Sequence, residues 1–173
     1  EVTDVRTLGE VPGGPPVVVV NLVELTYADA EGGVELYQVP LVFYEHPETR
    51  LDHAFVGWWE DAEHGWVHAY DALHDREAMA LWQRAFDAPG QATDRASEGL
   101  SFHRLPGHDL DLTAHSTLFS GEQSNSSVAF GEDALMKVFR KVTPGANPDI
   151  TVHAELTKAD SEHIAALYGW LEA

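Results

Sequence analysis

The chain has 173 residues, of which 44% are hydrophobic, and this suits one compact domain or two small ones packed together. Its formal charge of -19, from 10 basic and 29 acidic residues, argues against a surface for nucleic acid or anionic membrane, because both need clustered Lys and Arg. The absence of cysteine excludes disulfides and thiolate metal sites, and we expect neither a signal peptide nor a membrane span. These features suit a cytoplasmic protein.

The first part of the chain predicts an antiparallel sheet. Residues 1–16, which end in two glycines and two prolines, are expected to form a loop or a frayed edge. Strands are expected at Val17–Tyr27 and Val34–Tyr44, followed by a hairpin of strands at 54–59 and 66–70. These spacings predict a meander of about four strands.

Between Asp71 and Asp87 the period becomes helical. Apolar side chains recur at i, i+3 and i+7, which predicts an amphipathic helix packed on the sheet, through Met79, Trp82 and Phe86. Asp71 or Asp75 can cap its first turn. The Pro- and Gly-containing residues 88–98 are the best candidate for a linker.

A hairpin dominates the second part, after a short strand expected at Leu100–Leu105. Its first strand ends at Val128–Phe130, Gly131–Asp133 form the turn, and Ala134–Val142 form the second strand. Within the second strand Lys137 lies among residues that are apolar on both faces. Such a strand is usually covered on both sides, so an anionic group is expected to meet the ammonium. An edge strand with a lysine reaching along its surface is the competing interpretation.

The residues before the hairpin are small or polar and open on a glycine. Backbone N–H groups and hydroxyls of such a loop can bind phosphate oxygens, which gives as candidates Gly121, Gln123, Ser124, Asn125, Ser126 and Ser127. A loop over phosphates, a hairpin and then a strand lysine is the layout of the protein-kinase N-lobe.

The hairpin is followed by a predicted helix from Pro148 to about Thr157. Asn147 can cap it, with Pro at the first helical position. Residues 150–156 alternate as a strand would, but the capping residues favour a helix. The apolar run at residues 167–171 is expected either to dock on this domain or to belong to a larger protein, and we favour the second.

Several of these motifs resemble bacterial maltokinases. Residues 120–149 are similar to the start of the kinase-like part of that family, with its GEQSN loop, its LKVFR-type strand and its PGxNPD turn. YQVPL at Tyr37–Leu41 and YDALHDREAM at Tyr70–Met79 resemble the family's N-terminal cap domain, and the tail ALYGWLE also fits.

The resemblance implies an α+β fold in two parts. Residues 1–105 would be the cap, an antiparallel sheet with one packed helix, and residues 106–173 the first strands of a protein-kinase-like N-lobe. The implied reaction uses ATP and Mg²⁺ to convert maltose into maltose 1-phosphate in α-glucan and trehalose metabolism, with a trehalose synthase-type enzyme as a possible partner. No catalytic residue is expected before Ala173, because the family's base and metal ligands lie in the C-lobe.

The kinase pattern also includes a helix glutamate that holds the strand lysine. In the resembling family an acidic residue follows the NPD turn, where this chain has Thr151. Glu155, one helical turn later, is the expected substitute.

Other interpretations stay open at this point. The chain could serve a kinase of another sugar, such as an amino sugar, or be a non-catalytic module that docks a partner enzyme or a glycan. The ten histidines are scattered and predict no metal site, and no G-x-S-x-G motif for a nucleophilic serine is present.

Overall fold

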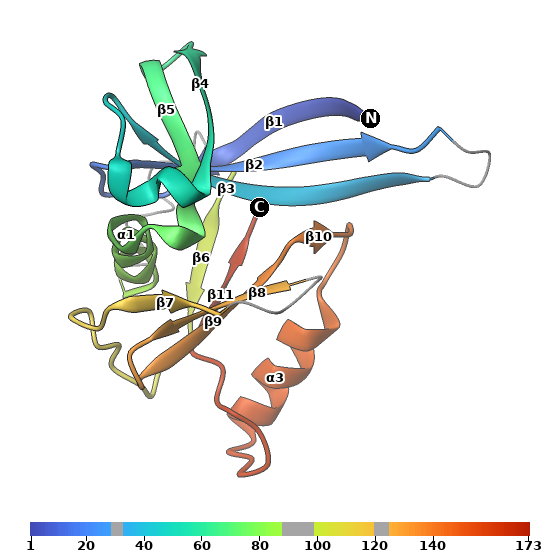
Figure 1. Ribbon diagram of the computed structural model, residues 1–173. Coiled ribbons are helices and arrows are strands. Elements are labelled where there is room, and N and C mark those ends of the chain that lie inside the picture. Colours follow the sequence, from blue (N-terminus) through green and yellow to red (C-terminus); the bar gives the residue numbers. More distant parts are fainter. Residues whose placement is uncertain (29–32, 88–98, 120–124) are drawn as a thin grey trace.

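The computed structural model describes residues 1–28, 33–87, 99–119 and 125–173, and their fold is α+β, mostly antiparallel sheet with a few helices (Figure 1). The strands are β1 Val2–Glu10, β2 Val17–Thr26, β3 Val34–Tyr44, β4 Phe55–Asp61, β5 Gly65–Asp71, β6 Ser101–Arg104, β7 Ser116–Leu118, β8 Asn125–Phe130, β9 Ala134–Phe139, β10 Lys141–Val142 and β11 Gly169–Glu172. The α-helices are α1 Arg76–Asp87 and α3 Pro148–Lys158, and short 3-10 helices lie at η1 Thr49–Ala54 and η2 Ala72–His74. The predicted α+β class is therefore confirmed.

The largest sheet has the strand order β1-β2-β3-β5-β4, and β10 pairs with β3 outside this path. A simple meander, which we predicted, would place β4 beside β3, and that part of the prediction is wrong. Val67, Ala69 and Tyr70 of β5 are buried, whereas most residues of β4 are exposed. The more apolar strand therefore takes the central position, and η1 carries the chain out to the edge.

Strand β1 is a correction to the sequence analysis, which expected a loop or a frayed edge over residues 1–16; the segment does lie at the sheet edge, but as a paired strand. β1 pairs with β2 from Val2↔Leu25 to Glu10↔Val19, with irregularities near each end. Its first six residues are exposed. A polar, irregular sequence is typical of an edge strand, where side chains meet water on both faces. Such a strand lacks the alternation of apolar and polar residues by which strands are predicted.

Helix α1 confirms the predicted amphipathic helix. Met79 and Trp82 are 0% and 3% exposed, and Phe86 packs edge-to-face on Phe102. Both predicted caps exist, but on two different helices. The Asp71 carboxylate accepts from the Leu73 N–H at the start of η2, and the Asp75 carboxylate accepts from the Glu77 N–H at the start of α1.

The second part of the chain forms two small sheets, β7-β8-β9 and β6-β11. The predicted hairpin and the strand near Leu100–Leu105 are confirmed as β8, β9 and β6. The second hairpin strand ends at Phe139 and not at Val142 as predicted, because Lys141 and Val142 form β10 and pair with β3. The last apolar run docks on this domain as β11, which pairs with β6. Helix α3 is also as predicted, because the Asn147 side chain accepts from the Asp149 N–H and Pro148 opens the helix.

One hydrophobic core joins the elements before and after residue 105. Buried side chains from β2 and α1, such as Val18 and Leu81, lie in the same cluster as Val128, Phe130 and Val138 from β8 and β9. The division of the chain near residue 105 stays a prediction, and the proposed linker at 88–98 lies outside the described residues.

Candidate functional site

The hairpin β8-β9 places Lys137 directly opposite Ser127. In the pairing register Ser127↔Lys137 and Asn125↔Phe139 are cross-strand neighbours, and such neighbours carry their side chains on the same face. Asn125, Ser127 and Lys137 therefore share one face of the hairpin. Ser126 lies on the opposite face, with Val128 and Val138.

Lys137 meets a carboxylate, as expected, but at the protein surface. Its ammonium donates to Asp149 Oδ2 at 2.9 Å and lies 4.9 Å from the centre of the Phe139 ring. The Lys137 side chain is 46% exposed, and Leu135 on the same face is 63% exposed. The expectation that this strand is covered on both sides is therefore wrong at Leu135 and Lys137. The competing interpretation is confirmed, because β9 is an edge strand of its sheet within the described residues and Lys137 lies along its surface.

Asp149 is held in place by the first turn of α3. Its N–H donates to the Asn147 side chain at 2.9 Å, which closes the helix cap. The hydrogen bond from Lys137 is the main cause that holds the pKa of Asp149 below its usual value. A carboxylate in the first turn is also stabilised by the positive end of the helix dipole.

Glu155 does not take the role expected for it. Its carboxylate accepts from Lys158 at 2.7 Å, and the carboxylate that binds Lys137 is that of Asp149. The separation of six positions between Asp149 and Glu155 corresponds to about 9 Å along the helix axis. Because Lys137 faces the first turn of α3, the acidic residue at the helix start is the one within its reach.

The side chain of Ser126 binds Arg140, a contact that the sequence analysis missed. Arg140 Nε donates to Ser126 Oγ at 2.9 Å, and its Nη2 lies 3.0 Å from Asp71 Oδ2. Arg140 lies two residues after the buried Val138, so alternation places both side chains on the same face. A cation on a buried face needs a partner, and this alternation could have indicated the contact from the sequence. The loop residues Gly121, Gln123 and Ser124 lie outside the described residues.

The start of β3 holds the end of the hairpin. Lys141 and Val142 of β10 pair with Tyr37 and Leu36, and the Gln38 side chain donates to the Phe139 carbonyl at 2.6 Å. These bonds connect the first sheet to the strand that carries Lys137.

Glu35 anchors this junction through three hydrogen bonds. It accepts from Lys141, Tyr37 and Tyr27, and these bonds, led by the one from Lys141, lower its pKa to about 2. The same carboxylate raises the pKa of Tyr27 to about 12. Both shifts have one cause, because the bonds stabilise the ionised Glu35 and the neutral Tyr27.

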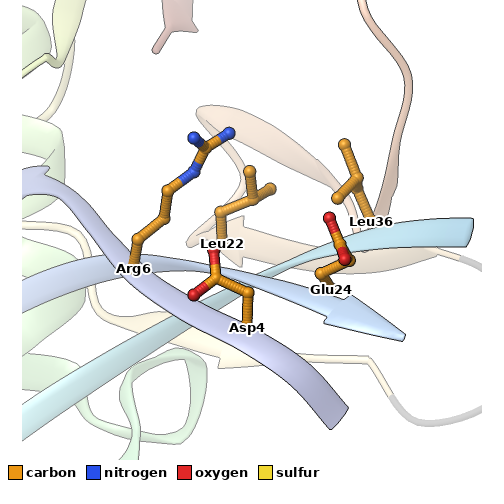
Figure 2. A pocket seen from close by; sticks show the side chains of 5 residues that line it. All are labelled: Asp4, Arg6, Leu22, Glu24 and Leu36. Atoms are coloured by element: carbon orange, nitrogen blue, oxygen red, sulfur yellow. The ribbon is translucent and has the colours of Figure 1, made fainter. Parts of the chain in front are cut away.

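A shallow hollow lies on the first sheet, between the side chains of three neighbouring strands (Figure 2). It is lined by Asp4, Arg6, Leu22, Glu24 and Leu36. Its volume is about 60 Å³, well below the roughly 300–1,000 Å³ of small-molecule sites. We therefore assign no ligand to it.

Two further features of the described residues bear on the chemistry. No group of three or more His, Asp or Glu side chains gathers there in an arrangement for a metal ion. No helix in that part of the chain is long and apolar enough to cross a membrane.

Comparison with protein families finds a match for the first part of the chain. Residues 1–75 match the family model of the maltokinase N-terminal cap domain. The matched region contains β1 to β5 and ends at Asp75, the residue that caps α1. This region, with its antiparallel sheet, is similar to the cap domain of maltokinases.

Proposed function

We propose that the chain is the N-terminal region of an ATP-dependent maltokinase. The full protein would transfer the γ-phosphoryl group of ATP to the anomeric hydroxyl of maltose, giving maltose 1-phosphate for α-glucan and trehalose metabolism in the cytoplasm. The observation that supports this best is the match of residues 1–75 to the maltokinase cap domain. The lysine hairpin, which pairs with β3 of the matched region through β10, adds a candidate nucleotide-binding element.

The residues near Lys137 suit a phosphate-binding role. Phosphoryl transfer depends on positioning and on neutralising charge, and kinases use a strand lysine for part of this. The bond from Lys137 to Asp149 is exposed to water, and exposed ion pairs are weak, so the ammonium can exchange this carboxylate for a phosphate. Asn125, which is half-buried on the same face, could donate to phosphate oxygens, whereas Ser127 is only 6% exposed and is assigned no such role.

Magnesium would neutralise phosphate charge when bound with ATP. On this proposal its ligands and the general base come from the C-lobe, so no metal-binding role is assigned to residues of this region. Lys137 would orient the phosphates, and Asp149 would hold the lysine when nucleotide is absent.

The test is maltose phosphorylation by the full-length protein. We expect Lys137→Ala to lower kcat by about 100-fold or more, the order seen when one charge-stabilising group is removed. Lys158→Ala is the matched control, because Lys158 is also exposed and paired with a carboxylate, and it should keep full activity. Unchanged kcat in Lys137→Ala would refute the assignment of the lysine.

The same assay separates the proposal from its alternatives. Phosphorylation of an amino sugar such as glucosamine, without turnover of maltose, would indicate a kinase of another sugar. If Mg-ATP causes no saturable change in tryptophan fluorescence of the 173-residue chain or of the full-length protein, the region acts as a non-catalytic module. A trehalose synthase-type enzyme is then the partner to assay first.

A further inference from the structure

The hairpin β4-β5 carries two tryptophans and a carboxylate on one face. Its register pairs Trp58 with His68 and Glu60 with Trp66, so these four side chains lie on the same side of the two strands. The hairpin extends beyond the rest of its sheet in Figure 1. We call this face, formed by Trp58, Glu60, Trp66 and His68, the tryptophan face.

Both tryptophans of this face are largely exposed, at 63% for Trp58 and 56% for Trp66. Their ring centres are 5.4 Å apart with a tilt of 36° between the planes. Trp59, which points to the other side of β4, packs instead on Phe43 in a second hydrophobic cluster. The core therefore does not need Trp58 or Trp66, and exposed aromatic groups of this size are typical of binding surfaces.

Glu60 gives the tryptophan face its charge. It is exposed and lies directly across from Trp66. Within the part of the chain that the structure describes, no hydrogen bond or ion pair engages its carboxylate. The formal charge of -19 adds a negative field around it.

We propose that the tryptophan face binds an arginine-bearing basic segment of a partner protein. A cation over an indole ring is attracted by the negative π face, and Trp is the best ring for this. A guanidinium can stack on an indole while it pairs with a carboxylate, which a compact ammonium does less well. Trp66 and Glu60 supply this combination side by side.

Charge complementarity decides against the other occupants. A purely apolar partner would bury the Glu60 carboxylate without a counter-charge, which is costly. Nucleic acid and anionic membrane would be repelled by the negative field. A neutral glycan could stack on the indoles, but it would gain nothing from the charge.

The experiment is a titration of the ¹⁵N-labelled 173-residue chain with a tetra-arginine peptide, followed through the indole N–H signals. A tetra-citrulline peptide of the same shape but without charge is the matched ligand. We expect the signals of Trp58 and Trp66 to shift with tetra-arginine only, while those of Trp82 and Trp170 stay in place. Trp58→Thr and Trp66→Thr should each weaken binding about fivefold or more.

A charge variant makes the test independent of any loss of folding. Glu60→Gln keeps the shape of an exposed side chain and should also weaken binding about fivefold, whereas Glu162→Gln, an exposed carboxylate elsewhere, should change it little. If both Gln variants weaken the binding of tetra-arginine equally, the peptide is attracted only by the net charge of the protein, and this would overturn the proposal. Shifts of Trp58 and Trp66 with maltoheptaose but not with tetra-arginine would assign the face to a glycan instead.

Discussion

Lys137 illustrates how far one residue can be understood from its neighbours in sequence. Its need for an anionic partner followed from the apolar strand around it, and Asp149 meets that need. The identity of the partner did not follow, because it depends on which turn of α3 faces β9. The sequence also did not predict that the face of β9 with Leu135 and Lys137 is exposed, because Leu135 is apolar and yet 63% exposed.

A second single-residue effect is the low pKa of Glu35. We expect Lys141→Met to raise this pKa from about 2 toward the ordinary value of 4.5, because the bond from Lys141 is the largest cause of the shift. The pKa should not reach 4.5, since Tyr27 and Tyr37 still donate to the Glu35 carboxylate. A ¹³C NMR titration of the Glu35 carboxyl group measures this pKa. Lys158→Met is the control and should leave the pKa unchanged.

The sign of the pH dependence follows from the same shift. Because the pKa of Glu35 is lower in the folded protein, Glu35 contributes stability above about pH 4.5, where its carboxyl group is already ionised in the unfolded chain. This contribution is lost as pH falls toward 2. In Lys141→Met the contribution should be smaller at neutral pH, and a more stable variant would contradict this reasoning.

Among the elements, α1 depends on the buried carboxylate that precedes it. Asp75 is 0% exposed and accepts from Arg50 at 2.7 Å, Tyr44 at 2.6 Å and the Glu77 N–H at 3.1 Å. The desolvation of Tyr44 and its bond to Asp75 raise the pKa of Tyr44 well above its usual value. Asp75 therefore joins the helix start to β3 and η1.

We expect Asp75→Ala to lower the free energy of unfolding by roughly 2–4 kcal/mol, from a lost helix cap and unsatisfied buried donors. Arg50 is 41% exposed and can regain water, so the loss should stay below that of a fully buried ion pair. Urea unfolding gives the value. Asp87→Asn, at the exposed end of the same helix, should change stability by less than about 0.5 kcal/mol.

The elements that sequence predicted well are those with strong local signals. Asn147 and Pro148 fixed the start of α3 despite an alternating pattern, and the apolar stripe of α1 fixed that helix. β1 and the placement of β5 beside β3 depend on contacts between distant residues, so local pattern could not supply them. For the candidate site, alternation within β9 was enough to place Lys137 on the face opposite Val138, whereas the pairing of Ser127 with Lys137 and the Ser126–Arg140–Asp71 contacts required the fold.

At the scale of the whole molecule, the excess of acidic residues should make stability depend on salt. With 29 acidic against 10 basic residues, like charges repel in the folded state, and salt screens this repulsion. Raising ionic strength from about 0.01 M to about 1 M shortens the Debye length from about 30 Å to about 3 Å. We expect Tm at pH 7 to rise, as measured by circular dichroism with NaCl. A fall in Tm would mean that the ion pairs outweigh the repulsion.

The divided edge of β3 has a consequence for synthesis of the protein. One half of that edge pairs with β5, and the other half pairs with β10, which is synthesised much later. Gln38 and the Phe139 carbonyl that it binds are 101 residues apart in the chain. At translation rates of about 5–20 residues per second, this interval is roughly 5–20 seconds. During that time the half of the β3 edge that pairs with β10 has no partner strand in the nascent chain. A chaperone or a second nascent chain can therefore bind this edge before β10 is synthesised.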